Sequence, residues 1–272
     1  MIWTIITVLI LIAAIALYLF AGKQDGKKVA SDTIASKGMS VVAIVLIAFS
    51  VCRLFTPTYL VKSNPAILQE MVQSMQAQQE QEKNKVVRQY VAKHMEDMIG
   101  NAPIAGNPEA KNTIFLWSDY SCPYCRRVHA ELSRVMKERN DVRIVLKNFS
   151  IHGALSDAPA KAVIAAKIQD NAKAAKLDEL LMAKEYYSQD DMKDQAKLPE
   201  KIQANVMKLA KEAGLDTKKL ATDMEGDVVK AELQNVRELA QRFEISGTPY
   251  LIIGDTAFPG YIPYNRIIEA LK

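Results

Sequence analysis

Two long apolar segments open the chain. The first 20 residues carry no charged side chain, and about 20 apolar residues match the hydrocarbon core of a bilayer. The second segment runs from about Met39 to Leu60 and contains Arg53, whose charge can reach the interface from near a helix end. We therefore predict two transmembrane helices, at about 2–20 and 39–60. A cleaved signal peptide for the first and a buried or interfacial helix for the second are the alternatives.

The lysines between these segments indicate an orientation. The connecting loop contains Lys23, Lys27, Lys28 and Lys37. Because short cytoplasmic loops are enriched in Lys and Arg, we predict a membrane anchor over 1–62 with a cytoplasmic loop. The C-terminal part is then extracytoplasmic, in the periplasm of a bacterial-type cell, where disulfides are permitted. Cys52, inside the second segment, is interpreted as an apolar packing residue.

A segment without Pro or Gly follows at Ala66–Ile99. Asn64-Pro65 is typical of a helix start and Gly100 of a helix end. Apolar residues recur at helical spacing near both ends, whereas the middle, QAQQEQEKNK, is polar. We predict one long helix, or two with a break in that middle, forming a stalk over 63–101. A homodimer through this helix is the alternative to a simple spacer, although the heptad pattern fails in the middle.

A globular domain is predicted over 102–272. The turn-rich stretch NAPIAGNPEAKN leads into an apolar strand, TIFLWS, at Thr113–Ser118. A helix follows at about Pro123–Glu138, and a second strand, VRIVLKNF, at Val142–Phe149. This β–α–β order favours parallel pairing of the two strands. From Gly153 to Glu244 the apolar spacing is helical, and the alternating Lys and Glu residues are interpreted as a solvated face.

The composition is that of a protein with a packed core and little net charge. Hydrophobic residues make up 49% of the 272 residues, and the formal net charge is +4. Basic and aromatic residues do not alternate in any cluster, so nucleic-acid binding has no support. The cysteines are more informative, because two of the 3 stand close together in SDYSCPYCRRVH.

Cys122 and Cys125 form a C-x-x-C motif, for which three interpretations exist. Zinc would need two further ligands, and the globular domain has no other cysteine and only His129 and His152. A structural disulfide in so short a loop would constrain the unfolded chain little. Between a strand and a helix, the motif is typical of a thioredoxin-like redox site. We therefore predict a redox pair, with no metal and no separate cofactor.

The motif's place at a helix start gives the two sulfurs different roles. Pro123 suits the first helical position, and the free amides and dipole of a helix N-terminus stabilise an anion. We expect Cys122 to be the exposed nucleophile, which loses its proton more readily than a free thiol. Cys125, one turn further on, is expected to be the sheltered resolving partner. A stable thiolate is also a good leaving group, so the disulfide form oxidises its client.

From about Ile104 to Lys272 the chain resembles DsbA-like thiol–disulfide oxidoreductases of the thioredoxin superfamily. The resemblance rests on CPYC after a strand, VRIVLKNFSIHG after the helix, and ISGTPYLIIGDTAFPGYIP near the C-terminus. It implies an α/β thioredoxin-like fold with a helical insertion at about 153–244. It also implies a cis-proline at Pro249 facing the cysteine pair, and we expect the Thr248 hydroxyl to lie near the Cys122 sulfur. The implied client-binding residues are Pro123, Tyr124, Thr248 and Pro249.

Two positions depart from the family pattern. Thioredoxins and many DsbA-like proteins have an acidic residue six positions before the first cysteine, where this chain has Leu116. Asp119, closer to the motif, is interpreted as a turn residue. Tyr124 replaces the His of a Pro-His pair, so we expect a less extreme oxidant than the family's strongest members. His129 is interpreted as a packed or surface residue.

The pattern at the C-terminus predicts a hairpin of strands at Tyr250–Gly254 and around Ala257-Phe258, and a last helix at about Tyr264–Lys272. Taken with the motif, the favoured function is an extracytoplasmic dithiol oxidase. A disulfide isomerase or reductase, and a membrane-tethered peptide-binding chaperone or assembly factor, are the alternatives. The predicted partners are cysteine-containing clients, a membrane redox partner and lipid, with no nucleic acid.

Overall fold

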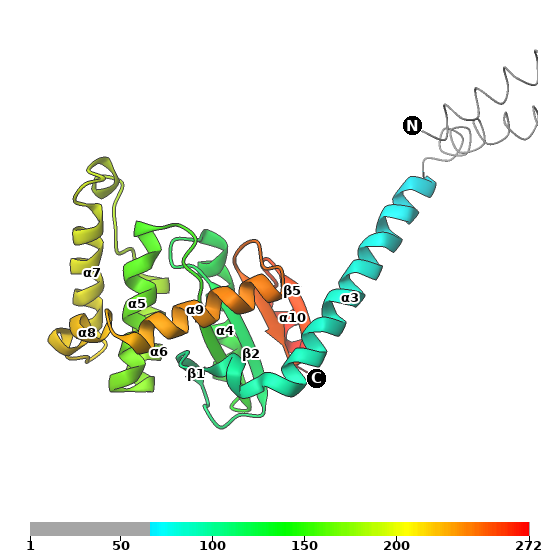
Figure 1. The fold of residues 1–272 in the computed structure, drawn as a ribbon, viewed down its shortest axis with the longest axis horizontal. Helices are drawn as coiled ribbons and strands as arrows, with labels where there is room; N and C mark the ends of the chain where they lie inside the picture. Colours follow the sequence, from blue (N-terminus) through cyan, green and yellow to red (C-terminus); the bar gives the residue numbers. More distant parts are fainter. Residues whose placement is uncertain (1–65, 272) are drawn as a thin grey trace, which may run out of the picture. The chain divides into compact units, whose positions relative to one another are not determined.

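The computed structural model describes residues 66–271 (Figure 1). The elements, in order, are α3 (Ala66–Ile99), β1 (Ile104–Gly106), β2 (Asn112–Ser118), α4 (Pro123–Glu138), β3 (Val142–Asn148), α5 (Ala154–Gln169), α6 (Asn171–Ala183), the 3-10 turn η1 (Asp191–Lys193), α7 (Leu198–Glu212), α8 (Thr217–Asp223), α9 (Asp227–Arg242), β4 (Tyr250–Ile253), β5 (Thr256–Pro259) and α10 (Tyr264–Ala270). The predicted transmembrane segments, with Cys52, lie outside the described residues. No helix within 66–271 is long and apolar enough to cross a membrane.

The five strands form one sheet in the order β1-β3-β2-β4-β5. Strands β2 and β3 are parallel, with Asn112 opposite Val142 and Ser118 opposite Asn148, which confirms the predicted β–α–β unit. The other neighbouring pairs are antiparallel. The predicted C-terminal hairpin is also confirmed, as β4 and β5. These strands bring the end of β2, which leads into the cysteine motif, beside the start of β4, which follows Pro249.

Strand β1 was not expected, because its residues lie in a stretch that the sequence pattern assigns to turns. It pairs antiparallel with β3 at the sheet edge. The side chain of Asn171 holds it from outside: Asn171 Oδ1 accepts the Ile104 amide at 2.9 Å, and Asn171 Nδ2 donates to the Ile104 carbonyl at 2.8 Å. A strand of 3 residues is too short to show a periodic pattern, so its formation depends on this long-range contact.

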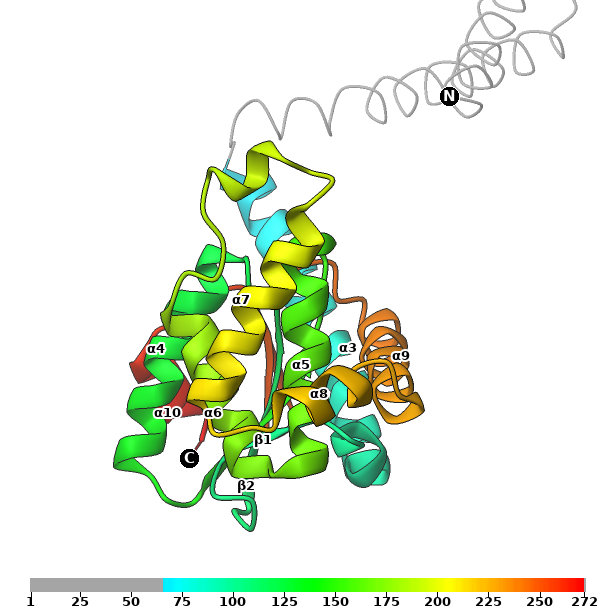
Figure 2. The same cartoon turned by 90° about the vertical axis from the view of Figure 1, so that its left-hand side faces the viewer.

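Each face of the sheet packs against its own helices (Figure 2). Because side chains alternate along a strand, Ile114 and Leu116 of β2 face α4 and α10, where they join one apolar cluster. Phe115 and Trp117 point to the opposite face and pack with α9 and the C-terminal part of α3. Burial of all four residues (0% exposed) explains why β2 reads as a continuous apolar run.

Helices α5 to α9 form the predicted helical insertion. Residues of α5, α6, α7 and α8 make a third apolar cluster, and Cys122 and Cys125 belong to it. One prediction for this region was wrong: Glu232 of α9 is not on a solvated face. It is 1% exposed and pairs with the buried Lys147 of β3 at 2.7 Å. A paired charge at this depth fixes α9 to the sheet, because either partner alone would be a buried, uncompensated charge.

Helix α3 is a single assigned helix that contains one break. The break is at His94 (φ −131°, ψ 29°), and not in the polar middle where the sequence placed it. The chain divides into two units, Met1–Gln78 and Gln79–Lys272. Within the second unit, Val87 and Met98 of α3 are core residues. The domain thus includes part of the segment that the sequence pattern assigns to the stalk.

Candidate active site

Cys122 caps the N-terminus of α4, as predicted. Its backbone is extended (φ −78°, ψ 119°), Pro123 begins the helix, and no side chain caps the helix amides. The first turn contains no acidic residue, and Arg126 and Arg127 follow directly after the motif. The Cys122 sulfur therefore lies at the positive end of the α4 dipole.

The two sulfurs differ in accessibility, but less than predicted. Cys122 is 6% exposed and Cys125 is 0% exposed, so Cys122 is not the exposed residue that the sequence suggested. The reason is the loop before β4: the Cys122 Sγ lies 3.5 Å from the carbonyl oxygen of Thr248. Only a narrow part of the Cys122 sulfur is left for an incoming client sulfur.

Burial dominates the acid–base behaviour of Cys125. It raises the pKa of the Cys125 thiol to about 12, although the hydrogen bond from the Asp119 amide opposes the shift. The Asp119 backbone N–H donates to the Cys125 sulfur at 3.4 Å. Near neutral pH Cys125 is therefore a protonated thiol, and any step in which it attacks or leaves must move a proton.

The Thr248–Pro249 peptide bond is cis, as the resemblance implies. The predicted role of the Thr248 side chain differs from the observed geometry. The backbone carbonyl of Thr248, and not its hydroxyl, contacts Cys122. The buried hydroxyl oxygen has no hydrogen-bond partner among residues 66–271. The family resemblance could place Thr248 at the site, but it could not show whether the backbone or the side chain of Thr248 contacts Cys122.

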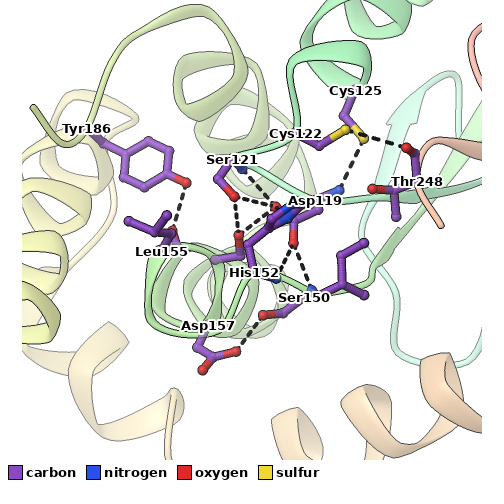
Figure 3. A network of polar contacts seen from close by, with 12 residues as sticks. Asp119, Ser121, Cys122, Cys125, Ser150, His152, Leu155, Asp157, Tyr186 and Thr248 are labelled. Atoms are coloured by element: carbon purple, nitrogen blue, oxygen red, sulfur yellow. Dashed lines mark hydrogen bonds and ion pairs between the residues drawn. The ribbon is translucent and has the colours of Figure 1, made fainter. Parts of the chain in front are cut away.

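Asp119 has a much larger role than the turn that the sequence assigned to it (Figure 3). Its Oδ1 accepts hydrogen bonds from the amide and hydroxyl of Ser121 at 2.8 and 2.9 Å and from the Ser156 hydroxyl at 2.5 Å. Its Oδ2 accepts the amides of Ile151 and His152 at 2.8 and 3.2 Å. One carboxylate thus joins the loop before α4 to the loop before α5.

These bonds set the ionisation of Asp119. Burial alone would raise the pKa of Asp119, but the hydrogen bonds from Ser156, Ile151 and Ser121 outweigh burial and hold it below its ordinary value. The His152 ring lies 3.1 Å from Oδ1 and adds to the effect. Asp119 is therefore a charged structural anchor at neutral pH and a poor proton acceptor.

Tyr124, a predicted site residue, is 56% exposed. The Arg127 guanidinium stacks over the rings of Tyr124 and Tyr261, at 5.7 and 4.5 Å. The Tyr124 ring, with Arg127 over it, thus presents an exposed apolar surface beside Cys122 to a client segment.

A groove of about 550 Å³ lies on the other side of the cysteine pair. Thr248, Pro249 and Phe258 form part of its wall, and Lys83 and Asn84 of α3 line it as well. The Asn84 side chain also accepts the Ala257 amide of β5 at 2.9 Å. The sequence pattern did not indicate that α3 reaches this groove.

Leu116 and His129 lie on the α4 side of the sheet. Leu116 is fully buried, so no carboxylate occupies the family's usual acidic position. His129 is packed, as predicted, and its Nδ1 lies 3.6 Å from Oδ2 of the buried Asp178. No group of His, Cys, Asp and Glu side chains within residues 66–271 is arranged to hold a metal ion.

Comparisons with known proteins agree with this arrangement. A family described as Thioredoxin matches residues 98–272. The crystal structure of a thioredoxin-like oxidoreductase from Silicibacter pomeroyi DSS-3 is 32% identical, with a TM-score of 0.56, over 64% of this chain and 94% of that one.

Two further proteins are similar to this chain. The catalytic domain of Proteus mirabilis ScsC is 27% identical, with a TM-score of 0.54, over 68% of this chain and 98% of that one. "Disulfide bond formation protein D" of Bacillus subtilis (strain 168) is 23% identical over 184 residues, which are 64% of this chain and 77% of the relative.

Proposed function

Because this chain belongs to the thioredoxin family and is a thiol–disulfide oxidoreductase, we propose that it is an oxidase that introduces disulfides into client proteins. In this proposal Cys122 is the attacked sulfur and Cys125 is the resolving partner. Tyr124, Thr248 and Pro249 contact the client, together with Pro123. A disulfide isomerase or a reductase would use the same residues with the pair held in the reduced state.

The asymmetry between the two cysteines carries this proposal. Cys122 stands at a helix N-terminus whose first turn contains no acidic residue, whereas Cys125 is fully buried. An environment that stabilises the Cys122 thiolate stabilises the reduced form of the pair. The disulfide is then easily reduced, and the client that reduces it becomes oxidised.

The groove beside Pro249 supports a protein client. At about 550 Å³ it has the size of a site for a short extended segment. The segment would lie along the loop before β4, with its cysteine next to the Cys122 sulfur. Backbone hydrogen bonds give affinity in this binding mode without demanding one sequence, which suits an enzyme with many clients.

The reduction potential of the pair tests the direction of catalysis. We expect equilibration with glutathione to give a value between those of the strong oxidant DsbA, about −120 mV, and of protein disulfide isomerase, about −180 mV. The purified full chain should also oxidise a reduced peptide with two cysteines. A potential near that of thioredoxin, about −270 mV, would assign the site to a reductase instead.

The same proposal places the enzyme on the extracytoplasmic side of the membrane, anchored by the segments at 2–20 and 39–60. The lysines between those segments, Lys28 among them, support a cytoplasmic loop there. Reporter fusions at Lys28 and after Lys272 test it. A C-terminal reporter active only in the cytoplasm would refute this topology.

Self-association through α3 is the remaining part of the proposal. An exposed apolar stripe occurs on its first turns, at Leu68, Met71, Val72 and Met75 (46%, 53%, 51% and 65% exposed). Residues at this spacing share one helix face, and a second copy of the helix would cover it. Sedimentation of the full chain in detergent should give a dimer that M71E/M75E converts to a monomer. An unchanged monomer in both proteins would refute the dimer.

A further inference from the structure

The proposed reaction requires a proton at Cys125 to move, and neither Leu116 nor Asp119, which precede the motif, provides an acceptor. With a pKa of about 12, only about 1 in 10⁵ Cys125 thiols is ionised at pH 7. Leu116 has no titratable group. Asp119 presents its amide to the Cys125 sulfur, while its carboxylate is occupied by Ser121, Ser156 and the amides of the next loop.

His129 is placed where an acceptor is needed. It follows Cys125 by one helical turn on α4, so the two side chains lie on the same side of the helix with Cβ atoms roughly 5–6 Å apart. Helical side chains also lean toward the N-terminus, which directs the imidazole back toward Cys125. The His129 side chain is 12% exposed, and its buried Nε2 has no hydrogen-bond partner among residues 66–271.

Asp178 of α6 sets the tautomer of this ring. Its Oδ2 lies 3.6 Å from His129 Nδ1, which is an ion-pair distance and slightly too long for a hydrogen bond. The carboxylate favours a proton on Nδ1, and this leaves the lone pair on Nε2. Asp178 Oδ1 accepts the Tyr120 hydroxyl at 2.8 Å. Tyr120 belongs to the same apolar cluster as Cys125. Through Tyr120, the His129–Asp178 pair is therefore held on the side of α4 that carries Cys125.

A pocket of about 340 Å³ adjoins the His129–Asp178 pair, and Leu116 also lines it. It has room for water, so the imidazole of His129 can exchange its proton with solvent on this side. The other charged groups on this pocket are Lys137 of α4 and the Lys176–Glu179 ion pair of α6.

We propose that His129, positioned by Asp178, exchanges the proton of Cys125 during thiol–disulfide exchange, in place of the acidic residue that Leu116 replaces. This inference rests on the proposed function of the cysteine pair. It assigns a role to a histidine whose sequence position alone suggested only packing.

The chemistry balances in both directions. When a client is oxidised, its first thiolate attacks the Cys122 sulfur, a mixed disulfide forms and the Cys122–Cys125 bond breaks. The electron pair goes to the Cys125 sulfur, which takes the proton from protonated His129. The client's second thiolate then attacks the client sulfur of the mixed disulfide, the client disulfide forms, and Cys122 leaves as a thiolate. When the pair is reoxidised by a disulfide such as glutathione disulfide, Cys122 first forms a mixed disulfide. Nε2 of neutral His129 then takes the Cys125 proton, and the Cys125 thiolate attacks Cys122 and expels the second thiol.

The test separates the step that uses Cys122 from the step that uses Cys125. The full chain, with Cys122 joined to glutathione, is followed by acid quench and mass spectrometry as Cys125 resolves the mixed disulfide. We expect H129Q to resolve it on the order of 100-fold more slowly at pH 7. The wild-type rate should rise with pH as the imidazole loses its proton, and H129Q should lose this inflection. Alkylation of Cys122 by iodoacetamide should be unchanged.

The chain contains a matched control. His94 of α3 also pairs with an aspartate, Asp97, at 3.1 Å, so H94Q should leave both steps and the pH profile unchanged. A second variant, D178N, keeps the histidine and should shift the inflection to lower pH, because the imidazolium loses its counter-charge. If H129Q does not give a cooperative melting transition, D178N tests the role of His129 in its place.

Three results are decisive against the inference. Normal resolution in H129Q, slow resolution with the wild-type pH profile, or an unshifted inflection in D178N would each leave His129 a packing residue. In all three cases the proposed function stands. If the wild-type chain does not exchange with glutathione disulfide at all, the proposed function itself fails.

Discussion

Asp119→Asn is the substitution that tests the structural account of the site most directly. Asparagine has the shape of aspartate but keeps only one acceptor oxygen. If that oxygen takes the Oδ1 position, the new amide group faces the N–H groups of Ile151 and His152, which now donate to Oδ2. Two hydrogen bonds to a charged acceptor are then lost and two donors are left facing another donor.

The expected cost follows from these two bonds. A hydrogen bond to a charged group contributes about 1.5–3 kcal/mol, so we predict that Asp119→Asn lowers the free energy of unfolding by about 3 kcal/mol at pH 7. For a domain of this size, the melting temperature should fall by roughly 6–12 °C. Thermal and urea unfolding of the full chain, followed by circular dichroism, measures both. Asp227→Asn is the control, because that side chain is fully exposed and should change stability by less than about 0.5 kcal/mol.

The pH dependence gives a second, independent check. The folded-state pKa of Asp119 lies below its ordinary value of 3.8. A depressed pKa means that the stabilisation is present above the unfolded value and is lost as the pH falls through the folded one. The stability gap between wild type and Asp119→Asn should thus be constant from pH 7 to about 5 and shrink below about 4. A loss under about 1 kcal/mol at pH 7, or a gap that ignores pH, would refute this account of Asp119.

Three further predictions concern the cysteines, Thr248 and the buried ion pair. Cys125→Ser should accumulate mixed disulfides with clients on non-reducing gels, because Cys122 still bonds to a client sulfur and no resolving cysteine releases it. Cys122→Ser should accumulate none. The opposite pattern would reverse the two roles. Thr248→Val should change the free energy of unfolding by less than about 1 kcal/mol, since the hydroxyl has no hydrogen-bond partner within 66–271. It should still shift the glutathione equilibrium, because it replaces a buried hydroxyl by a methyl group on the residue whose carbonyl contacts Cys122; an unchanged equilibrium would separate the Thr248 side chain from the site. Lys147→Met should lower the free energy of unfolding in urea by about 3–5 kcal/mol, because it leaves Glu232 buried without a cation. The double variant Lys147→Met with Glu232→Leu should recover most of this loss. Equal losses in the two proteins would contradict an ion-pair role.

The sequence was most informative where a local pattern is sufficient. Helix α4 begins and ends where its pattern predicts, because Pro123 marks its start and the apolar face at Val128, Leu132 and Val135 is unbroken. Strands β2 and β3 are recognisable because both are buried on both faces. The cis bond at Pro249 came from the family resemblance and not from any local pattern.

The sequence failed where a residue's role depends on distant partners. Asp119 resembles a turn residue, and only the arrival of Ser156 and Ile151 from the next loop makes it an anchor. Glu232 belongs to an ordinary amphipathic pattern until Lys147 is found opposite it. In both cases the partners come from other elements of the fold, so the local sequence could not name them.

The helical insertion controls the chemistry of the cysteine pair as well as the shape of the domain. Cys125 shares an apolar cluster with α5, α6 and α7, including Leu177 and Val163, and burial is the largest cause of its raised pKa. Any substitution that loosens this cluster admits water to the Cys125 sulfur and makes its thiolate less costly. The stability of the insertion and the reactivity of the resolving cysteine are therefore coupled. Because Asp119 ties the loop before α4 to the loop before α5, it transmits the same coupling to Cys122.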